Sequence, residues 1–508
     1  MKKSIVAVGV LVVLGGAWVG GSWYTGKVIQ SEIEKSLVNA QKYIEQYAPE
    51  YKIKMNITDY QRGVFSSQVS YAFDVANGNG SDSVSIAQKI SHGPFPLDHF
   101  SLSPKLAFSK TELIKQPSLD SFFDMAGGKS PLNVEVLASY DGSSEGKVVI
   151  EPLTDKSDGT FKFSGLTLNV AGQVKDGETN FTMTSSPFDM TEHGSQVSYD
   201  MAKVAGTQNK SKEYTVDGSL GKLTIAKLGD EGEKEQIILN NLTVKSQGKA
   251  GKFDMNLGLI NIALQNVTYT INDKPKMVMD GLTAVSNVQE DEKFINQVID
   301  TTIGQLNLDG KNLGSGSMKV KLDRFDGGAL QYLNKNSDQL AYLYMAGATS
   351  PQGESNLMMN NLMTFLDANP TISITPLTWK NDKGESQIDM ALTLMRPASL
   401  EFSDMTQLLL NSVKQFNSST KLSVPMLTEM TKLQYELSGG LSAEDSQTQA
   451  TASVQQTIDM GIAQKMLSKK DDNTVTSYFN YADGMLDLNG QKMPAEQFIN
   501  MFMMPGIE

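Results

Sequence analysis

Cysteine is absent from this chain of 508 residues, and that absence excludes several kinds of chemistry. Without a thiol, the protein has no disulfide, no thiolate nucleophile, no cysteine-ligated zinc and no iron–sulfur cluster. The absence would let the chain fold in an oxidising compartment without mispairing, but cysteine-free chains also arise without that pressure. We therefore use it to exclude chemistry rather than to assign a compartment.

Histidine is also scarce, with three residues in the chain. His92 and His99 flank Asp98 in a pattern that suggests a metal site. However, Pro94 and Pro96 hold the backbone extended, and no helical ligand spacing such as HExxH is present. We interpret the segment as a structural loop and predict no metal and no cofactor.

Familiar catalytic motifs are missing. The chain has no GxSxG nucleophile elbow, no Walker-type phosphate loop and no strand-linked GxGxxG fingerprint. A carboxylate pair of the glycosidase kind need not be close in sequence, and nothing selects one pair among the 57 acidic residues. We predict no catalytic residue and favour a protein without enzymatic activity, with an envelope hydrolase as a third hypothesis.

Positive charge is in deficit, since the formal net charge is −13 and the sequence pI is about 4.9. Binding to nucleic acid requires clustered Lys and Arg to neutralise phosphates, and the chain has no basic stripe. We therefore exclude nucleic acid as a partner.

Long hydrophobic runs are confined to the N-terminus. Residues 4–26 carry no charge, and their apolar core at 5–21 follows two lysines and precedes two aromatic residues. A helix here would just span a bilayer, with the lysines inside and the body outside. We predict a membrane anchor at residues 1–26, formed by Ile5, Val8, Val12, Leu14, Trp18, Trp23 and Tyr24.

The alternative to an anchor is a cleavable signal peptide, because Gly20, Gly21 and Ser22 are small enough for a signal peptidase. The long apolar segment and the missing Ala-x-Ala pattern favour the anchor. Gly16 and Gly20 also form a GxxxG pair, through which two such helices could associate.

An amphipathic helix is predicted at residues 27–50. Ile33, Leu37 and Ile44 belong to an apolar stripe with a spacing of three and four. This stripe could form a short coiled coil with a second copy, although packing on the protein's own sheet is the favoured interpretation.

The body begins with two segments in which apolar and polar residues alternate, at 51–58 and 65–75. A period of two predicts half-buried antiparallel strands, and similar patterns recur with polar turns over the next 250 residues or so. We predict an antiparallel β-rich region at 51–325.

A weak repeat appears within this region, at residues 163–168, 239–244 and 279–284. Each segment has an apolar residue, two small or polar residues, then Leu-Thr and a further apolar residue. The spacing is irregular, so we interpret the repeat as a recurrent bulge or turn where a strand begins rather than as a solenoid.

Residues 326–508 are predicted to mix helices with strands. Helical patterns cover 329–345, 357–366, 405–416, 426–437 and 454–467, and strands are predicted at 371–380 and 387–395. A hairpin closes the chain, with a type I′ turn expected at Asn489 and Gly490. The predicted fold class is thus α+β, with an N-terminal transmembrane helix, a large antiparallel strand-rich body and amphipathic helices in its C-terminal third.

Several motifs together resemble the YdgA family of Gram-negative inner-membrane-anchored proteins. They are Gly-Ser-Trp-Tyr-Thr-Gly at 21–26, Tyr-Gln-Arg-Gly-Val-Phe-Ser-Ser at 60–67, His-Gly-Pro-Phe-Pro at 92–96 and Tyr-Ala-Asp-Gly-Met-Leu-Asp-Leu-Asn-Gly at 481–490. The resemblance implies a single-pass inner-membrane protein with a periplasmic body, and it brings no catalytic residues. The layout also looks loosely like AsmA-type envelope proteins, an architectural analogy that gives weak support for function.

Two main hypotheses of function follow. The first is a non-enzymatic envelope protein whose sheet binds or conducts lipid or another apolar ligand. The second is a structural homodimer without a ligand, which associates through Gly16, Gly20, Ile33, Leu37 and Ile44. The alternation of apolar residues is compatible with both hypotheses, because strands that line an open groove and strands that cover a filled core have the same period of two.

Overall fold

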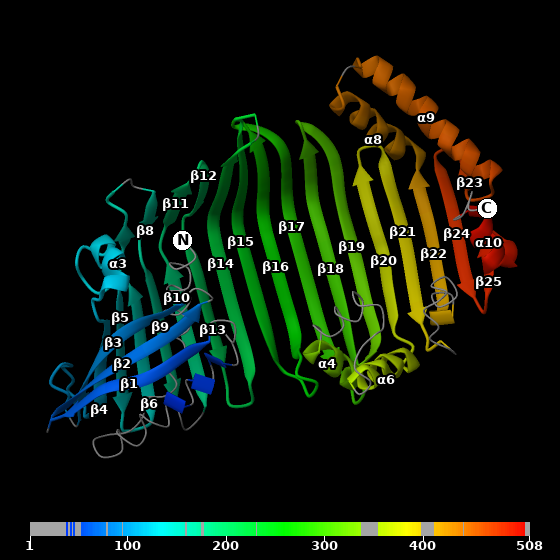
Figure 1. Ribbon diagram of the computed structural model, residues 1–508. Helices are drawn as coiled ribbons and strands as arrows, with labels where there is room; N and C mark the ends of the chain where they lie inside the picture. The colour runs from blue at the N-terminus through cyan, green and yellow to red at the C-terminus, as the bar shows by residue number, and fades with distance from the viewer. Residues whose placement is uncertain are drawn as a thin grey trace. The chain divides into compact units, whose positions relative to one another are not determined.

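The computed structural model describes most of the body, and the described residues are 37–38, 41–42, 44–45, 52–63, 65–77, 80–93, 95–157, 160–173, 177–229, 231–336, 354–397, 411–439 and 441–502. They form two compact units, Met1–Gly232 and Glu233–Glu508. Each is built mainly on antiparallel strands, so the prediction of a large antiparallel strand-rich body is confirmed (Figure 1). In these ranges no helix has the length and apolarity needed to cross a membrane, and the span predicted at 5–21 lies outside them.

Unit 1 is an antiparallel meander in which strands that are consecutive along the chain pair with one another. Four of its long strands are interrupted and therefore carry two labels each, β6 with β7, β8 with β9, β10 with β11, and β12 with β13. Pro152, Gly165 and Pro187 lie at these interruptions, where a ladder hydrogen bond is missing or the backbone is left-handed. The elements are β1 Ile53–Arg62, β2 Ser66–Asn77, β3 Gly80–His92, β4 Lys105–Leu113, η2 Pro117–Leu119, α3 Asp120–Met125, β5 Leu132–Ser139, β6 Ser143–Ile150, β7 Leu153–Thr154, β8 Phe161–Phe163, β9 Leu166–Gln173, β10 Glu178–Ser185, β11 Phe188–Glu192, β12 Ser195–Tyr199, β13 Ala202–Gln208 and β14 Glu213–Leu228.

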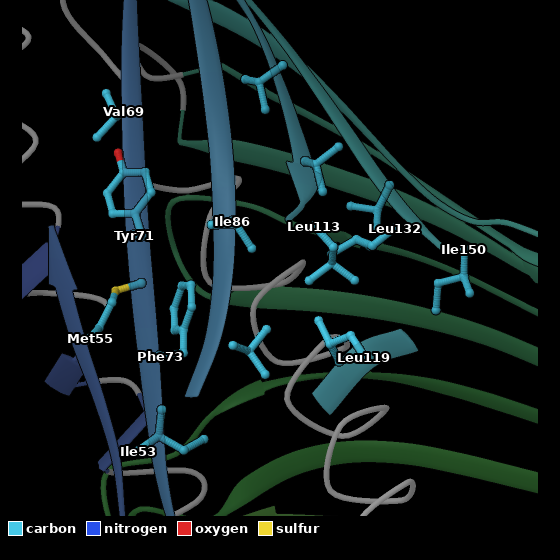
Figure 2. Packing of buried hydrophobic residues seen from close by; sticks show 14 of the residues in the cluster. Ile53, Met55, Val69, Tyr71, Phe73, Ile86, Leu113, Leu119, Leu132 and Ile150 are labelled. Carbon is cyan, nitrogen blue, oxygen red and sulfur yellow. The ribbon is translucent and has the colours of Figure 1, made fainter. Parts of the chain in front are cut away.

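A filled hydrophobic core lies on one face of this meander. The predicted alternation appears directly as burial, since every second residue of β5 is buried from Leu132 to Ala138. Tyr71 and Phe73 of β2 are 0% exposed and pack with residues of β1, β3 and β5 (Figure 2). Burying one such side chain stabilises the fold by about 1.5–3 kcal/mol before conformational entropy is counted. A shift of one residue would turn the buried side chains out of this core, so the core specifies the register of these strands.

Unit 2 is a second meander with longer strands. The strands from β15 to β22 pair in chain order, and β22 then pairs with β24 across the inserted helices α8 and α9. The elements are β15 Lys234–Ala250, β16 Asn256–Ile271, β17 Lys274–Glu290, β18 Phe294–Leu308, β19 Lys311–Asp326, α4 Gly327–Lys335, α6 Glu354–Asp367, β20 Thr371–Asn381, β21 Gly384–Leu394, β22 Val413–Ser423, α8 Val424–Leu437, α9 Ala443–Ala463, β23 Ser468–Asp471, β24 Thr474–Ala482, β25 Met485–Leu488, β26 Gln491–Pro494 and α10 Ala495–Phe502.

The local turn and bulge predictions are confirmed. Asn489 and Gly490 join β25 to β26 with φ of 51° and 88°, as a type I′ turn requires. The third residue of each repeated segment is also left-handed, with φ of 103° at Gly165, 53° at Asn241 and 67° at Gly281. Each lies at a break in the ladder of paired residues, so the repeat marks strand irregularities.

One helix prediction is wrong. The helix expected at 405–416 would include Val413 and Phe416, but these residues belong to β22. Phe416 pairs with Leu392 of β21 and with Tyr481 of β24, so the sheet outweighs the local helical spacing there. Residues 405–410 of that prediction lie outside the described ranges.

Candidate ligand-binding face

The sheet of unit 2 has one apolar face, which follows from its antiparallel register. Directly paired residues on neighbouring strands point to the same side of a sheet. Ile262 of β16 pairs with Val244 on one side and Ala284 on the other. The same row continues through Thr301, Met318, Leu377 and Ile388.

Two further rows have the same character. One begins at Ser246 and runs through Ile260, Ser286, Ile299, Val320, Ile374, Met390 and Ser418. The other begins at Gly248 and runs through Gly258, Val288, Gln297, Leu322, Ile372, Leu392 and Phe416. We define the apolar band as Ile260, Ile262, Ala284, Val288, Ile299, Met318, Val320, Leu322, Ile372, Ile374, Leu377, Ile388, Met390, Leu392 and Phe416.

The size of the apolar band follows from strand geometry. Its rows are two residues apart, so the three rows from Met318 to Leu322 span about 14 Å along the strand. Across the sheet, neighbouring strands are about 4.8 Å apart, so the band extends about 29 Å from β16 to β22. Each leaflet of a bilayer has a hydrocarbon depth of about 15 Å, so an extended acyl chain would fit along the band.

The apolar band is only half-buried. Ile260 is 38% exposed and Ile262 is 39% exposed, whereas Ile86 in the core of unit 1 is 4% exposed. The other band residues have intermediate exposure. A contiguous apolar surface of this kind marks a binding surface more often than an isolated exposed side chain does.

Helices pack at the two ends of these strands (Figure 1). At one end, Val454 and Ile458 of α9 pack with Val475 of β24 in a small core. At the other end, Phe325 of β19 meets Phe365 of α6, with ring centroids 5.1 Å apart. The helices thus lie beside the band, at its ends.

An ion pair fixes α8 to the sheet. The Lys311 ammonium of β19 lies 2.8 Å from a carboxylate oxygen of Glu436. This hydrogen bond, followed by the positive charges of Lys311 and Lys432, lowers the pKa of Glu436. The carboxylate is therefore ionised at neutral pH and holds the helix in place.

The opposite face of the sheet is mainly polar. The Thr283 and Thr302 hydroxyls are 2.6 Å apart, and Lys319 pairs with Asp300 at 3.2 Å. Water can solvate these groups without a covering layer. The sheet is therefore amphipathic, with aliphatic chemistry on one side only.

The residues predicted to anchor the protein, Ile5, Val8, Val12, Leu14, Trp18, Trp23 and Tyr24, lie outside the described ranges. So do Gly16, Gly20 and Ile33 of the predicted self-association surface. Of the remaining two, Ile44 is 1% exposed in the core of unit 1, and Leu37 packs against the same core. In this chain, both contact the protein's own sheet.

In the segment of residues 92–99, the side chains of His92, Asp98 and His99 contact three different partners. His92 Nε2 lies 3.0 Å from the hydroxyl of Ser67, and Asp98 accepts a hydrogen bond from Ser91 at 2.5 Å. The His99 ring packs at a tilt against Phe108, with ring centroids 5.0 Å apart. Across the described ranges, no group of three His, Asp or Glu side chains could hold a metal ion.

The contact between Ser67 and His92 joins two residue types that serine hydrolases use. Ser67, however, is 1% exposed, so a substrate could not reach its hydroxyl. The pair therefore links β2 to the end of β3 and has a structural role.

These features define a large antiparallel β protein with an amphipathic sheet. The chain belongs to the family described as "bacterial protein of unknown function (DUF945)", whose model matches residues 1–176 and 174–496. It is 29% identical over 527 residues to protein YdgA of Escherichia coli, an alignment that covers 100% of this chain and 98% of that protein. The predicted resemblance to the YdgA family is confirmed.

Two further relatives are uncharacterised proteins. Protein YihF of Escherichia coli is 25% identical over 528 residues, covering 98% of each chain. A protein of Haemophilus influenzae is 24% identical over 341 residues, covering 66% of this chain and 85% of that protein. No solved structure matches the chain.

Proposed function

We propose that this is a non-enzymatic envelope protein, anchored in the inner membrane with its body in the periplasm, which binds the acyl chains of lipid along the apolar band. The observation that carries the proposal is the half-exposed aliphatic surface on one face of the unit 2 sheet. Ile260 and Ile262 of β16 each expose more than a third of their surface, although both are paired with residues of β15 and β17 within the sheet.

The chemistry of the apolar band favours an aliphatic ligand. Its side chains are almost all branched aliphatics or methionine, which adapt to a flexible chain. The polar residues within its rows are uncharged, such as Ser286, Thr301 and Gln297. A charged ligand group would find no counter-ion there and would remain at the edge of the sheet.

The location rests on the sequence of the N-terminus. Lys2 and Lys3 before an uncharged span, with Trp23 and Tyr24 after it, match the charge and aromatic pattern of a single-pass anchor with the body outside. Topology is tested by modifying a Lys129→Cys variant in intact spheroplasts with a maleimide that cannot cross the inner membrane. Modification places the body in the periplasm, and protection until lysis places it in the cytoplasm.

Lipid binding is tested by photocrosslinking in cells. The photoreactive residue p-benzoylphenylalanine replaces Ile262 in the apolar band or, as a matched control, exposed Lys245 on the opposite face of the same sheet. We expect a lipid adduct, detected as a mass increase of the full chain, at position 262 and not at 245.

Two results would overturn the proposal. Equal labelling at both positions, or no lipid at either, would show that the apolar band has no preference for lipid. A covalent dimer formed through position 262 would instead support the structural homodimer, with the band as the interface between two copies.

A further inference from the structure

A second apolar surface lies on unit 1, in the loop of residues 93–104 between β3 and β4. Four large side chains in this loop are strongly exposed: Phe95 at 57%, Leu97 at 77%, Phe100 at 88% and Leu102 at 91%. All four values exceed those of Ile260 (38%) and Ile262 (39%) in the apolar band. The loop therefore presents its apolar residues directly to solvent.

Two neighbouring turns add to this surface. The amide of His92 donates to the carbonyl of Phe65 at 2.8 Å, which places the β1–β2 turn beside the start of the loop. A Cβ at Gly93 would lie 2.8 Å from the hydroxyl of Tyr140, so the β5–β6 turn is adjacent too. Phe65 is 67% exposed and Tyr140 is 56% exposed. We define the apolar tip as Phe65, Phe95, Leu97, Phe100, Leu102 and Tyr140.

Polar and aromatic contacts hold the loop in place, while its large apolar side chains stay exposed. Asp98 accepts a hydrogen bond from Ser91 and pairs with Lys89 at 2.9 Å, and the His99 ring packs at a tilt against Phe108. Exposing four large apolar side chains of one loop to water is unfavourable. The exposed side chains are therefore positioned for a non-aqueous environment.

We propose that the apolar tip inserts into the interfacial region of a lipid bilayer. Aromatic residues and leucines, interspersed with serine hydroxyls, are the composition that peripheral proteins place at the boundary between headgroups and acyl chains. The charge is also suitable. Lys89 pairs with Asp98, Lys105 acts on Asp141 beside Tyr140, and exposed Arg62 in the adjacent hairpin adds a positive charge that can meet lipid phosphates. This inference rests on the proposed membrane location and adds a second contact with a bilayer.

The shape of the tip favours a bilayer over a protein partner. Its side chains come from three adjacent turns at one end of the unit 1 sheet and are more than half exposed. A protruding set of this kind can enter a fluid surface without a complementary pocket, whereas a protein partner would need one.

The experiment uses the full chain in vesicles of phosphatidylethanolamine and phosphatidylglycerol. Because the chain has no cysteine, a single Leu102→Cys variant accepts one environment-sensitive fluorophore. We expect its emission to shift to shorter wavelength, nitroxide-labelled lipid to quench it, and aqueous iodide to lose most of its quenching.

The matched control is a fluorophore at Lys129→Cys. Lys129 is exposed in the same unit but precedes β5, whereas Leu102 precedes β4; since these strands are antiparallel, the two sites lie at opposite ends. We expect iodide to quench the fluorophore at 129 fully and lipid nitroxide to leave it unaffected. A further variant carries the fluorophore at Leu97→Cys together with Phe100→Ser and Leu102→Ser. We expect iodide to quench this fluorophore more strongly than the same label without the two serine substitutions.

Two outcomes would overturn the inference. A fluorophore at 102 that iodide quenches as strongly as the one at 129 would place the tip in water. A fluorophore shielded from both quenchers would place it against protein, such as a second copy. Neither outcome depends on lipid crosslinking at position 262, so failure of the tip and failure of the apolar band are distinguishable.

Discussion

Both units contain strands in which alternate residues are apolar, but these residues are buried in unit 1 and partly exposed in unit 2. In β5 of unit 1, alternate residues from Leu132 to Ala138 are at most 7% exposed, because they pack in a core that also includes Phe123 of α3 and Ile44. In β16 of unit 2, Ile260 and Ile262 occupy equivalent alternate positions and are 38% and 39% exposed. The comparison shows that alternation defines an apolar face, and that the covering elements decide whether this face becomes a core or a surface.

The largest expected effect comes from truncating one isoleucine in each unit. Ile86→Ala should destabilise unit 1 by about 2–5 kcal/mol, because it leaves a cavity in a packed core. Ile260→Ala should cost less than about 1 kcal/mol, because water already reaches that side chain. Urea denaturation followed by circular dichroism measures both; equal losses would mean that the apolar band is as covered as the core.

A smaller effect is expected from breaking one polar contact in each unit. The Tyr71 hydroxyl donates to Gln88 Oε1 at 3.0 Å, and burial raises the pKa of this phenol, so it stays protonated. Tyr71→Phe should cost about 1–3 kcal/mol, because Gln88 is 3% exposed and loses a donor. Thr283→Val on the polar face should stay within about 0.5 kcal/mol, because water replaces the lost contact.

The matched double variant Tyr71→Phe with Gln88→Leu tests the origin of that cost. Replacing both partners by apolar groups removes the unsatisfied amide, so most of the lost stability should return. A double variant no more stable than Tyr71→Phe alone would show that packing around the ring, rather than the hydrogen bond, sets the cost.

The smallest effect concerns pH and is expected in unit 1. The Ser91 hydroxyl and then Lys89 lower the pKa of Asp98, so the ionised carboxylate stabilises the folded loop. This contribution is fully present above the unfolded pKa of about 3.9 and is lost as pH falls through the lower folded value. The midpoint temperature of thermal denaturation should therefore fall less steeply between pH 6 and pH 2 in Asp98→Asn than in the unmodified chain. Identical slopes would contradict the assignment.

Much of the fold could be predicted from local pattern. Alternation located the strands, Asn489 and Gly490 identified a type I′ turn, and the repeated segments at 163–168, 239–244 and 279–284 marked irregular strand positions. These features depend on backbone sterics within a few residues, and sequence records such preferences directly. The strand at Val413–Ser423 was missed because its pairing with β21 and β24 is non-local.

The candidate site could not be predicted in the same way. Most band residues are aliphatic and recur at every second position of a strand. Nothing in the sequence of β16 indicates that Ile260 remains exposed. Likewise, the prolines near His92 indicated a loop, but the outward orientation of Phe100 and Leu102 follows from the contacts of Asp98 and His99. Both surfaces depend on which elements cover them, and that information is distributed over distant parts of the chain.

The chain-order pairing of β15 to β22 has a consequence for how unit 2 forms and how it can vary. Each strand hydrogen-bonds to the strands next to it in sequence, so most of its ladder contacts have short loops to close, and contact order is low for a β protein. Assembly can then propagate hairpin by hairpin from any starting point. A sheet of this design can also gain or lose a whole hairpin without re-pairing its other strands, so the width of its apolar band can change in steps of two strands.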